Sequence, residues 1–595
     1  GVNITTIEIL TIINTMLGGL ALFLTGMDTL SDSLTALTVG TLKKVIGGVT
    51  KNRFLAYFFG TVVTAVVQSS SAITVLSVGL VNSGIIELGN AVGLVMGANL
   101  GTTATAWVLS LNAIDGASIL LTVIKPSFFS PFLAIIGIAM RLFCKSDKRK
   151  IIGSALLGFA IMMIGMNLMS QGISPLKSVP FVRNTLVSFA NPVAGFLVAC
   201  AFTMLIQSSD AIIGIVQAFA LSIGMSYGMS IPLICGAQVG TCITALLSSL
   251  GTTNNGKRTA LLNLYYNLLK TLPIMIIFYS LNALFGFSFL KQDVGGIGIP
   301  VVHTLLNIIG SVVWLPLAGV IVSLAKRTIP LSEAEHQEHI NTLTMLDKNL
   351  LRTPPIALSQ ANKAVVLLSK TVGDAFLSIM GIRQDSDKAE QARLLCKRSE
   401  RFLSQIDDYL LQISEHDIKN NDMAYMYLLG SVGTAFGRMG KALERIIDMI
   451  VKVADSPEIM TPEERKEIDI LGEAIYEIIQ LTISNFTARN TTVSKTIQYY
   501  REEIMELSAI AKRRHVRKIH KEGHHHHQDM LYTDICYAQE QLIDYCDMIA
   551  DALIRYEQDT GVIRQKERVT DERSRKQIHE LFRDKYEVLG FERDE

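Results

Sequence analysis

The sequence has few of the features on which soluble enzymes and disulfide-bonded proteins depend, and acidic residues are scarce in its first half. Residues 1–327 hold only 8 Asp and Glu against 18 Lys and Arg, whereas the rest of the 595-residue chain holds 45 and 36. None of the seven cysteines form a C-x-x-C pair, which argues against a zinc site or a disulfide framework. No G-x-S-x-G, no G-x-x-x-x-G-K-[ST] loop and no basic face occur. These absences argue against the common hydrolases and phosphate-loop enzymes and against nucleic-acid binding.

Long apolar stretches are abundant in the first half instead. Several reach about 20 residues, the length that spans the ~30 Å hydrocarbon core of a bilayer. One such stretch fits a buried helix of a soluble protein, but a series predicts a membrane domain. The first stretch lacks a basic region before it, so we expect no cleavable signal peptide. The stretches are 7–30, 54–82, 88–110, 117–143, 151–173, 193–224, 231–250, 259–289 and 299–325.

Basic residues gather in three loops, at Lys43–Arg53, Arg141–Lys150 and Lys326–Arg327. The positive-inside bias places such loops in the cytoplasm. If 54–82 and 193–224 each crossed once, five spans would separate the last two loops, which is impossible. We therefore predict that both segments are re-entrant hairpins. The N-terminus then lies outside and the C-terminal half in the cytoplasm of a cell membrane, which we expect to be a bacterial inner membrane.

Two parts of the first half are related by a constant offset in residue number. Gln68-Ser-Ser-Ser matches Gln207-Ser-Ser-Asp, and Gly97-Ala-Asn-Leu-Gly-Thr matches Gly236-Ala-Gln-Val-Gly-Thr. Gly19 and its neighbours match the segment that begins at Gly158. Three spans separate the starts of the copies, so the second copy is inverted. Inverted repeats, here about 18–105 and 157–244, are typical of secondary transporters.

The polar tips of the two hairpins have the chemistry of an ion site. Hydroxyl, amide and freed carbonyl oxygens suit Na⁺, and helix N-termini suit an oxyanion. The alternative is that Ser and Gln only join neighbouring helices by hydrogen bonds. Because the group occurs twice, each time at the same spacing before a Gly-Ala-(Asn/Gln)-x-Gly-Thr segment, we favour a functional site.

This pattern resembles the sodium/phosphate cotransporter (Na/Pi) family over roughly residues 7–325. The resemblance implies sodium-coupled uptake of inorganic phosphate by alternating access, with unwound segments at the Gly-Ala motifs. The binding elements that it implies are Gln68, Ser69, Ser70, Ser71, Asn99, Thr102, Thr103, Gln207, Ser208, Ser209, Asp210, Gln238 and Thr241.

Two carboxylates, Asp28 and Asp210, lie in the apolar half of the sequence. The second motif commonly ends in Ser in the family, whereas this chain has Asp210. A carboxylate repels phosphate and attracts Na⁺, so we predict that Asp210 belongs to a cation site. Asp28 either assists that site or is a helix-end residue at the membrane interface.

The second half predicts a different kind of structure. A polar linker, 328–355, ends in Pro354-Pro355, and apolar residues recur beyond it at helical spacing between charges, as in Leu443, Ile446, Ile447 and Ile450. This pattern predicts a soluble amphipathic bundle over 356–595. His524–His527 are expected in a solvated loop between helices.

Two E-x-x-x-D motifs occur in this half, at Glu444/Asp448 and Glu540/Asp544. Their i, i+4 spacing puts both carboxylates on one helix face. The pair resembles the PhoU domain, a module of two three-helix repeats whose motifs bind metal. The resemblance implies a divalent, iron or zinc ion, and a solvated acidic face is the alternative.

The sequence therefore predicts an all-α, polytopic membrane transporter of two inverted repeats with re-entrant hairpins, followed by a PhoU-like cytosolic domain. We predict that it is not an enzyme, that Na⁺ is the coupling ion and that phosphate is the substrate. A membrane-anchored phosphate-sensing protein without transport is the alternative. The oligomeric state stays open, with a homodimer as one choice.

Overall fold

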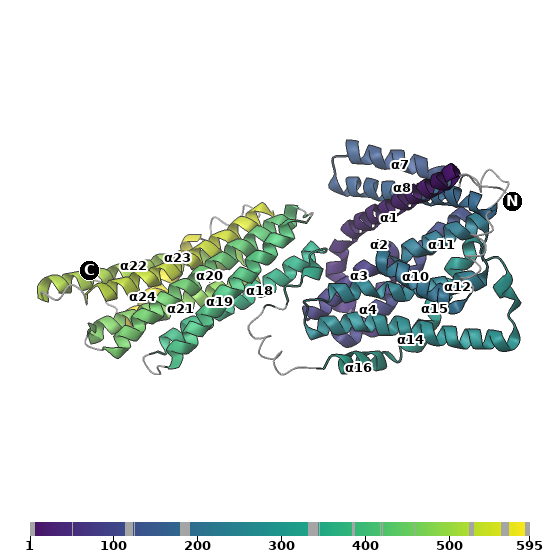
Figure 1. Ribbon diagram of the computed structural model, residues 1–595. Helices are drawn as coiled ribbons and strands as arrows, with labels where there is room; N and C mark the ends of the chain where they lie inside the picture. The colour runs from purple at the N-terminus through teal and green to yellow at the C-terminus, as the bar shows by residue number, and fades with distance from the viewer. Residues whose placement is uncertain are drawn as a thin grey trace. The chain divides into compact units, whose positions relative to one another are not determined.

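The computed structural model describes residues 6–49, 52–113, 123, 125–178, 191–330, 343, 345–382, 387–416, 418, 420–456, 459–522, 529–560 and 571–588. Within these ranges the chain is helical, and one isolated β-bridge joins Ser226 to Asp293, which confirms the predicted all-α class. Two compact units divide the chain, Gly1–Glu333 and Ala334–Glu595 (Figure 1). His524–His527 lie outside the described residues.

The first unit is built from helices of very different lengths. They are α1 (Thr6–Val49), α2 (Arg53–Val67), α3 (Ser70–Asn82), α4 (Leu88–Gly101), α5 (Thr103–Ser110), α7 (Pro126–Phe143), α8 (Asp147–Ile173), α10 (Pro192–Ile206), α11 (Ser209–Ile223), α12 (Tyr227–Gly240), α13 (Cys242–Ser248), α14 (Asn254–Phe285), α15 (Gly295–Trp314) and α16 (Ala318–Thr328). Four short 3₁₀ turns connect elements of the described chain, at Leu111–Ala113, Ser174–Ser178, Ser288–Lys291 and Lys348–Leu350.

Six stretches of the described helices are long and apolar enough to cross a bilayer. They are Leu10–Thr38, Leu88–Ala113, Asp147–Leu176, Tyr227–Ser248, Asn254–Phe285 and Gly295–Trp314.

Three of the segment boundaries predicted from the sequence differ from those of the structure. The first predicted loop begins too early, because α1 continues through Lys43 and Lys44 to Val49. The predicted span 117–143 is described as a helix only from Pro126. The predicted span 299–325 is broken between α15 and α16, where Pro316 removes a backbone donor.

Helices α2, α3, α10 and α11 are too short to cross the membrane alone. They contain 15, 13, 15 and 15 residues, or about 20–22 Å at 1.5 Å per residue. Two residues separate α2 from α3, Gln68 and Ser69, and two separate α10 from α11, Gln207 and Ser208. The polar motifs therefore lie at breaks between short helices, as the hairpin interpretation requires.

Helices α1 and α8 pack antiparallel through glycines, and α8 also packs against α7 (Figure 1). A Cβ on Gly26 would lie 2.2 Å from the Met162 nitrogen, and one on Gly158 would lie 2.5 Å from the Leu30 nitrogen. Backbones approach this closely only where no side chain intervenes. The repeated glycine motif of the sequence therefore forms the contact between the two helices.

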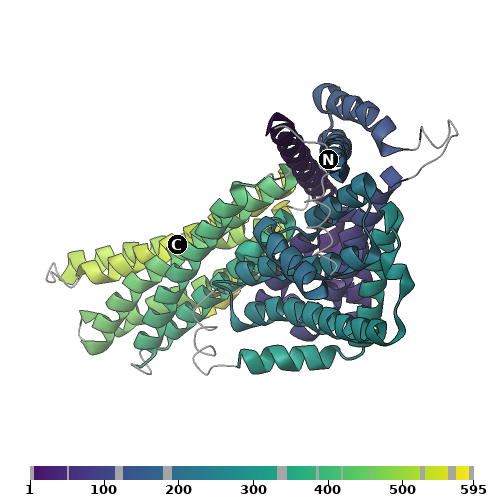
Figure 2. The same cartoon turned by 45° about the vertical axis from the view of Figure 1, so that its right-hand side comes forward.

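The second unit consists of long amphipathic helices that run alongside one another (Figure 2). Helices α18, α19 and α20 contact one another, as do α21, α22 and α23, and the two groups meet through α20–α23 and α18–α21. Apolar residues such as Leu443, Ile447 and Leu542 are fully buried between them. The bounds are α18 (Pro354–Met380), α19 (Asp387–Ser414), α20 (Asn420–Asp455), α21 (Pro462–Ala488), α22 (Thr491–Glu522), α23 (Asp529–Asp559) and α24 (Asp571–Val588).

Candidate functional site

The two polar tips have the same backbone geometry. Gln68 ends α2 in the left-handed conformation, with φ 60°, and Gln207 ends α10 with φ 59°. Ser69 and Ser208 follow in extended conformations and accept hydrogen bonds from the backbone N–H groups of Ala72 and Ala211. Each tip is therefore a helix C-terminus joined directly to the N-terminus of the next helix.

Both tips lie in one cavity, although they belong to different repeats and are far apart in the chain. We call it the tip cavity. Asp28 from α1 lines it together with Asp210 from α11, so it contains two carboxylates. Asp210 is 6% exposed, and its Oδ1 has no hydrogen-bond partner in the described part of the chain. The lining residues are Leu24, Met27, Asp28, Ser31, Gln68, Ser69, Ser70, Ser71, Ile206, Gln207, Ser208, Ser209 and Asp210.

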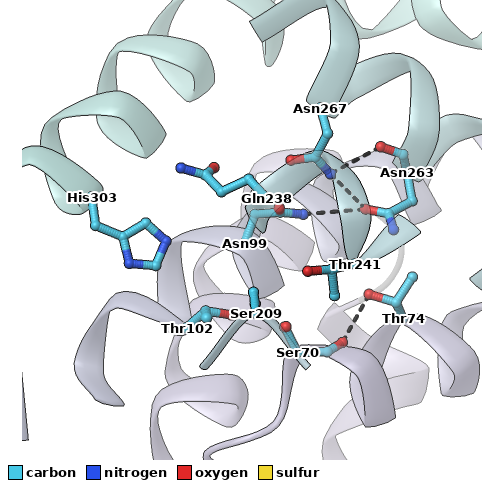
Figure 3. A pocket seen from close by; sticks show the side chains of 10 residues that line it. All are labelled: Ser70, Thr74, Asn99, Thr102, Ser209, Gln238, Thr241, Asn263, Asn267 and His303. Atoms are coloured by element: carbon cyan, nitrogen blue, oxygen red, sulfur yellow. Dashed lines mark hydrogen bonds between the residues drawn. The ribbon is translucent and has the colours of Figure 1, made fainter. Parts of the chain in front are cut away.

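A smaller cavity adjoins the tip cavity, because Ser70 and Ser209 line both. Its walls carry hydroxyl, amide and imidazole groups and no carboxylate (Figure 3). We call it the amide cavity. Its lining residues are Ser70, Thr74, Asn99, Thr102, Ser209, Gln238, Thr241, Asn263, Asn267 and His303.

The apolar unit is similar in sequence to known proteins. The Na+/Pi-cotransporter family model matches residues 22–171 and again 162–298, which together contain both tips and most of the amide cavity. The apolar unit of this chain is therefore similar to Na+/Pi cotransporters over most of its length. No solved structure matches the chain.

Named relatives cover different parts of the chain. "Putative inorganic phosphate export protein YjbB" of Salmonella typhimurium is 22% identical over 85% of this chain and 91% of its own length. "Uncharacterized protein YqeW" of Bacillus subtilis is 25% identical over 52% of this chain and 95% of its own length. "Sodium-dependent phosphate transport protein 2A" of the rat is 37% identical over 16% of this chain and 15% of its own length.

Twelve of the thirteen predicted site residues line one of the two cavities. Thr103 is the exception: its hydroxyl donates to the Leu100 carbonyl at 2.7 Å, and it lines neither cavity. The structure therefore gathers the other predicted residues, whereas the Thr103 hydroxyl bonds to the end of α4.

The Gly-Ala segments are not unwound, contrary to expectation. Thr102 and Thr241 have helical dihedral angles, and their N–H groups donate to the carbonyls four residues earlier. Their glycines serve helix packing instead. A Cβ on Gly97 would lie 2.0 Å from the Tyr57 carbonyl oxygen. Close packing of the helix backbones at these glycines brings Asn99 and Gln238 to the amide cavity on helical segments.

Sequence reasoning missed a polar face on α14 and α15. Asn263, Asn267 and Lys270 follow at i, i+4 and i+7 on α14, and His303 and Asn307 are four residues apart on α15. Lys270 is only 1% exposed. The helical spacing of polar residues within an apolar segment is the signal that could have found them.

The predicted metal site of the second unit finds no support in the described residues. No group of three His, Cys, Asp or Glu side chains is arranged there to hold a metal ion. Asp448 pairs with Arg393 at 2.8 Å, and Asp544 pairs with Arg501 at 2.9 Å. Glu540 pairs with Lys512 at 2.6 Å, and Glu444 is exposed. Basic side chains from neighbouring helices therefore pair with three of the four predicted metal ligands.

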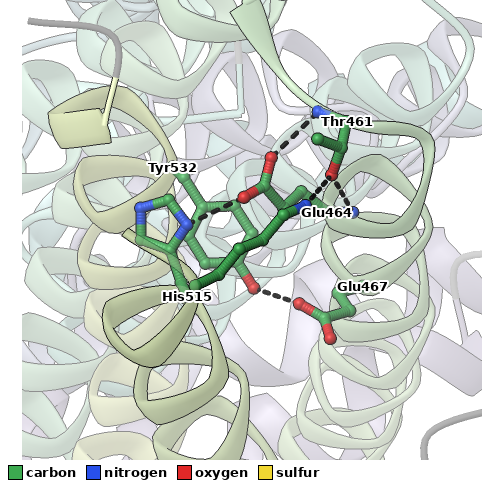
Figure 4. A network of polar contacts seen from close by, with 6 residues as sticks. Thr461, Glu464, Glu467, His515 and Tyr532 are labelled. Carbon is green, nitrogen blue, oxygen red and sulfur yellow. Dashed lines mark hydrogen bonds and ion pairs between the residues drawn. The ribbon is translucent and has the colours of Figure 1, made fainter. Parts of the chain in front are cut away.

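A buried polar network joins α21, α22 and α23 in this unit (Figure 4). Glu464 accepts hydrogen bonds from the Thr461 N–H and from His515 Nδ1, each at 2.9 Å. The Tyr532 hydroxyl donates to Glu467 at 2.6 Å, and the His515 ring stacks on the Tyr532 ring. Burial raises the pKa of Glu464, but hydrogen bonds from His515 and Thr461 outweigh it and lower the pKa to about 2. The network therefore stabilises an ionised Glu464.

Proposed function

We propose that the protein is a Na⁺-coupled transporter of inorganic phosphate. The observation that carries the proposal is the convergence of both polar tips in one cavity with Asp28 and Asp210, beside a second cavity lined by neutral polar groups. The match to the Na+/Pi-cotransporter family model and the printed name of the rat relative support the same pair of ions.

The tip cavity has the properties of the cation site. A buried carboxylate oxygen without a partner is costly unless a cation or proton satisfies it. Asp210 supplies that oxygen, and the hydroxyl groups of Ser69, Ser70 and Ser208 supply neutral oxygens nearby. Intramembrane carboxylates typically mark ion pathways.

Alternating access is the proposed mechanism, with the two inverted repeats moving around a fixed site. The antiparallel packing of α1 on α8, the matched left-handed glutamines and the two successive matches to the family model support this mechanism. Because both tips contribute to one cavity, movement of either repeat would change access to the ions from one side of the membrane.

The direction that we propose is import driven by an inward Na⁺ gradient. Export is the second candidate, since the relative that covers 85% of this chain is named as a phosphate export protein. The same site can serve both directions, because a secondary transporter follows the summed gradients of its substrates.

We propose that the second unit is a cytosolic PhoU-like regulatory domain. Its two groups of three helices support this interpretation, as does a relative that aligns over both units. The basic loop Arg141–Lys150 supports a cytoplasmic location for the C-terminal half through the positive-inside bias.

Radiolabelled phosphate uptake into proteoliposomes tests the function. The full-length protein is compared under an inward Na⁺ gradient, an inward K⁺ gradient and no gradient. Accumulation only with Na⁺ is expected. Absence of any Na⁺-dependent phosphate flux, in or out of loaded vesicles, would refute transport and favour the phosphate-sensing alternative. Flux that is equal in K⁺ would refute Na⁺ coupling while leaving phosphate transport in place.

A further inference from the structure

The amide cavity has a positively charged group behind it that the sequence motifs do not contain. Lys270 of α14 donates hydrogen bonds to Gln238 Oε1, to Asn267 Oδ1 at 2.9 Å and to Asn307 Oδ1 at 2.8 Å. Three donated hydrogen bonds require three N–H groups, which only the protonated ammonium has. The three surrounding acceptors therefore suit the charged form of Lys270.

The orientation of the acceptors is fixed by further contacts. Asn267 Nδ2 donates to the Asn263 carbonyl at 3.0 Å, and Asn307 Nδ2 donates to the His303 carbonyl at 3.0 Å. These bonds leave the two Oδ1 atoms to face Lys270. The ammonium thus lies among amide oxygens whose positions the neighbouring turns determine.

No carboxylate of the described residues pairs with this ammonium. The Lys270 ammonium also lies over the Tyr266 ring, whose centroid is 4.8 Å from Nζ. A buried charge without a counter-ion is costly, because its attraction to an opposite charge normally offsets the loss of hydration. The structure therefore holds an excess of positive charge beside the amide cavity.

Two groups that line the cavity lack partners and can receive a ligand. Lys270 holds Gln238 by its oxygen, so the Nε2 amino group of Gln238 is left for the cavity, and it has no hydrogen-bond partner among the described residues. His303 Nδ1 has none there either. Gln238 is 5% exposed and His303 is 1% exposed, and Figure 3 shows the Gln238 amide extending toward the His303 side of the cavity.

We propose that Lys270 is the positioning residue of the oxyanion half of the site. This inference rests on the proposed function. The phosphate lies at Ser70 and Ser209, where the cavities meet, with oxygens directed toward the Gln238 amino group and His303. Lys270 supplies the compensating charge and orients Gln238, while its own three N–H groups stay bonded to the protein.

This assignment divides the site by charge. Asp28 and Asp210 line the tip cavity, of about 260 Å³, and attract the cation. The amide cavity in front of Lys270 measures only about 10 Å³, room for about one water, so the phosphate lies at its junction with the tip cavity and directs oxygens into it. Ser70 and Ser209 line both cavities, so the bound Na⁺ and phosphate would be neighbours. Each ion then reduces the electrostatic cost of binding the other, which gives coupling a physical basis.

The test is phosphate uptake by the reconstituted full-length variant Lys270→Met. We expect the KM for phosphate to rise roughly 10- to 100-fold, as for loss of a hydrogen-bonded charge. The kcat and the Na⁺ concentration for half-maximal uptake at saturating phosphate should change less than about threefold. Lys270→Arg should recover part of the affinity. Lys257→Met, on the same helix, is the matched control and should behave as the wild type.

If Lys270→Met does not fold, a second variant tests the role of Lys270. Gln238→Glu places a carboxylate against Lys270 and neutralises it within the protein. We expect thermal stability at or above that of the wild type together with a phosphate KM raised at least tenfold. A wild-type KM in either folded variant would overturn the role of Lys270. If the wild type itself shows no Na⁺-dependent phosphate flux, the proposed function fails, and this inference with it.

Discussion

Gln68 and Gln207 both adopt the left-handed backbone conformation, with φ of 60° and 59°, and both line the tip cavity. This conformation costs a non-glycine residue about 1–3 kcal/mol, and glycine is the usual residue at such helix ends. The chain keeps glutamine at both positions. The amide of Gln68 donates to the Ala65 carbonyl in the last turn of α2, and we predict that both glutamine side chains also contribute to the site.

The first prediction separates the backbone role of Gln68 from its side-chain role. Gln68→Gly should fold with a stability within about 1 kcal/mol of the wild type, because glycine adopts the left-handed conformation without a clash. Phosphate uptake should fall at least tenfold, because the amide is lost. Thermal unfolding and uptake measure the two effects, and Gln207→Gly should behave alike. Normal uptake by both variants would show that the amides are not needed.

The tips could be predicted from sequence because their polarity contrasts with the apolar residues around them and because the same offset relates several pairs of motifs. Lys270 could not be recognised by the same reasoning. Its acceptors Gln238 and Asn307 lie 32 and 37 residues away on other helices. The spacing of Asn263, Asn267 and Lys270 marks a polar face on α14, but it does not show which side chains of other helices that face contacts.

Two misjudgements have one physical origin, which is that sequence spacing does not show tertiary partners. The resemblance implies unwound Gly-Ala segments, but these segments are helical, and Gly97 accommodates the backbone of Tyr57. The E-x-x-x-D motifs imply metal ligands. Arg393 and Arg501, which come from other helices, pair with Asp448 and Asp544 instead.

A second prediction concerns the cation site. Asp210→Ser should raise the Na⁺ concentration for half-maximal phosphate uptake roughly tenfold or more, because the buried carboxylate is lost. The KM for phosphate at saturating Na⁺ should change much less. Uptake is measured over a range of Na⁺ concentrations at constant ionic strength. Asp147→Asn, an exposed aspartate at the start of α8, serves as the control. An unchanged Na⁺ dependence in Asp210→Ser would remove Asp210 from the cation site.

A third prediction moves Lys270 without replacing it. A Cβ on Gly310 would lie 2.4 Å from Lys270 Cγ, so Gly310→Ala must displace the lysine side chain. We expect a severalfold to tenfold rise in the phosphate KM with little change in kcat. Gly319→Ala is the matched control, because no atom of the described residues lies within 4 Å of its Cβ position. Equal KM values in the two variants would mean that the position of Lys270 has no influence on phosphate.

The last prediction concerns the acid stability of the second unit. The pKa of Glu464 in the folded protein, about 2, is lower than its ordinary value of 4.5. The folded state therefore binds this proton less readily than the unfolded state does. The resulting stabilisation is fully present above pH 4.5 and is lost as the pH falls toward 2. At neutral pH it amounts to about 2–3 kcal/mol at most.

Glu464→Gln should remove this contribution at pH 7 and show little additional effect near pH 2. The difference in stability between variant and wild type should therefore shrink as the pH falls from 5 to 3. Thermal unfolding of the full-length protein, followed by helical circular dichroism across this range, measures it. Glu463→Gln, an exposed neighbour on the same helical turn, should be neutral at every pH. If the difference in stability between Glu464→Gln and wild type stayed constant with pH, the charge of Glu464 would not be what stabilises the network. A constant difference would instead reflect a loss of packing or of hydrogen-bond geometry.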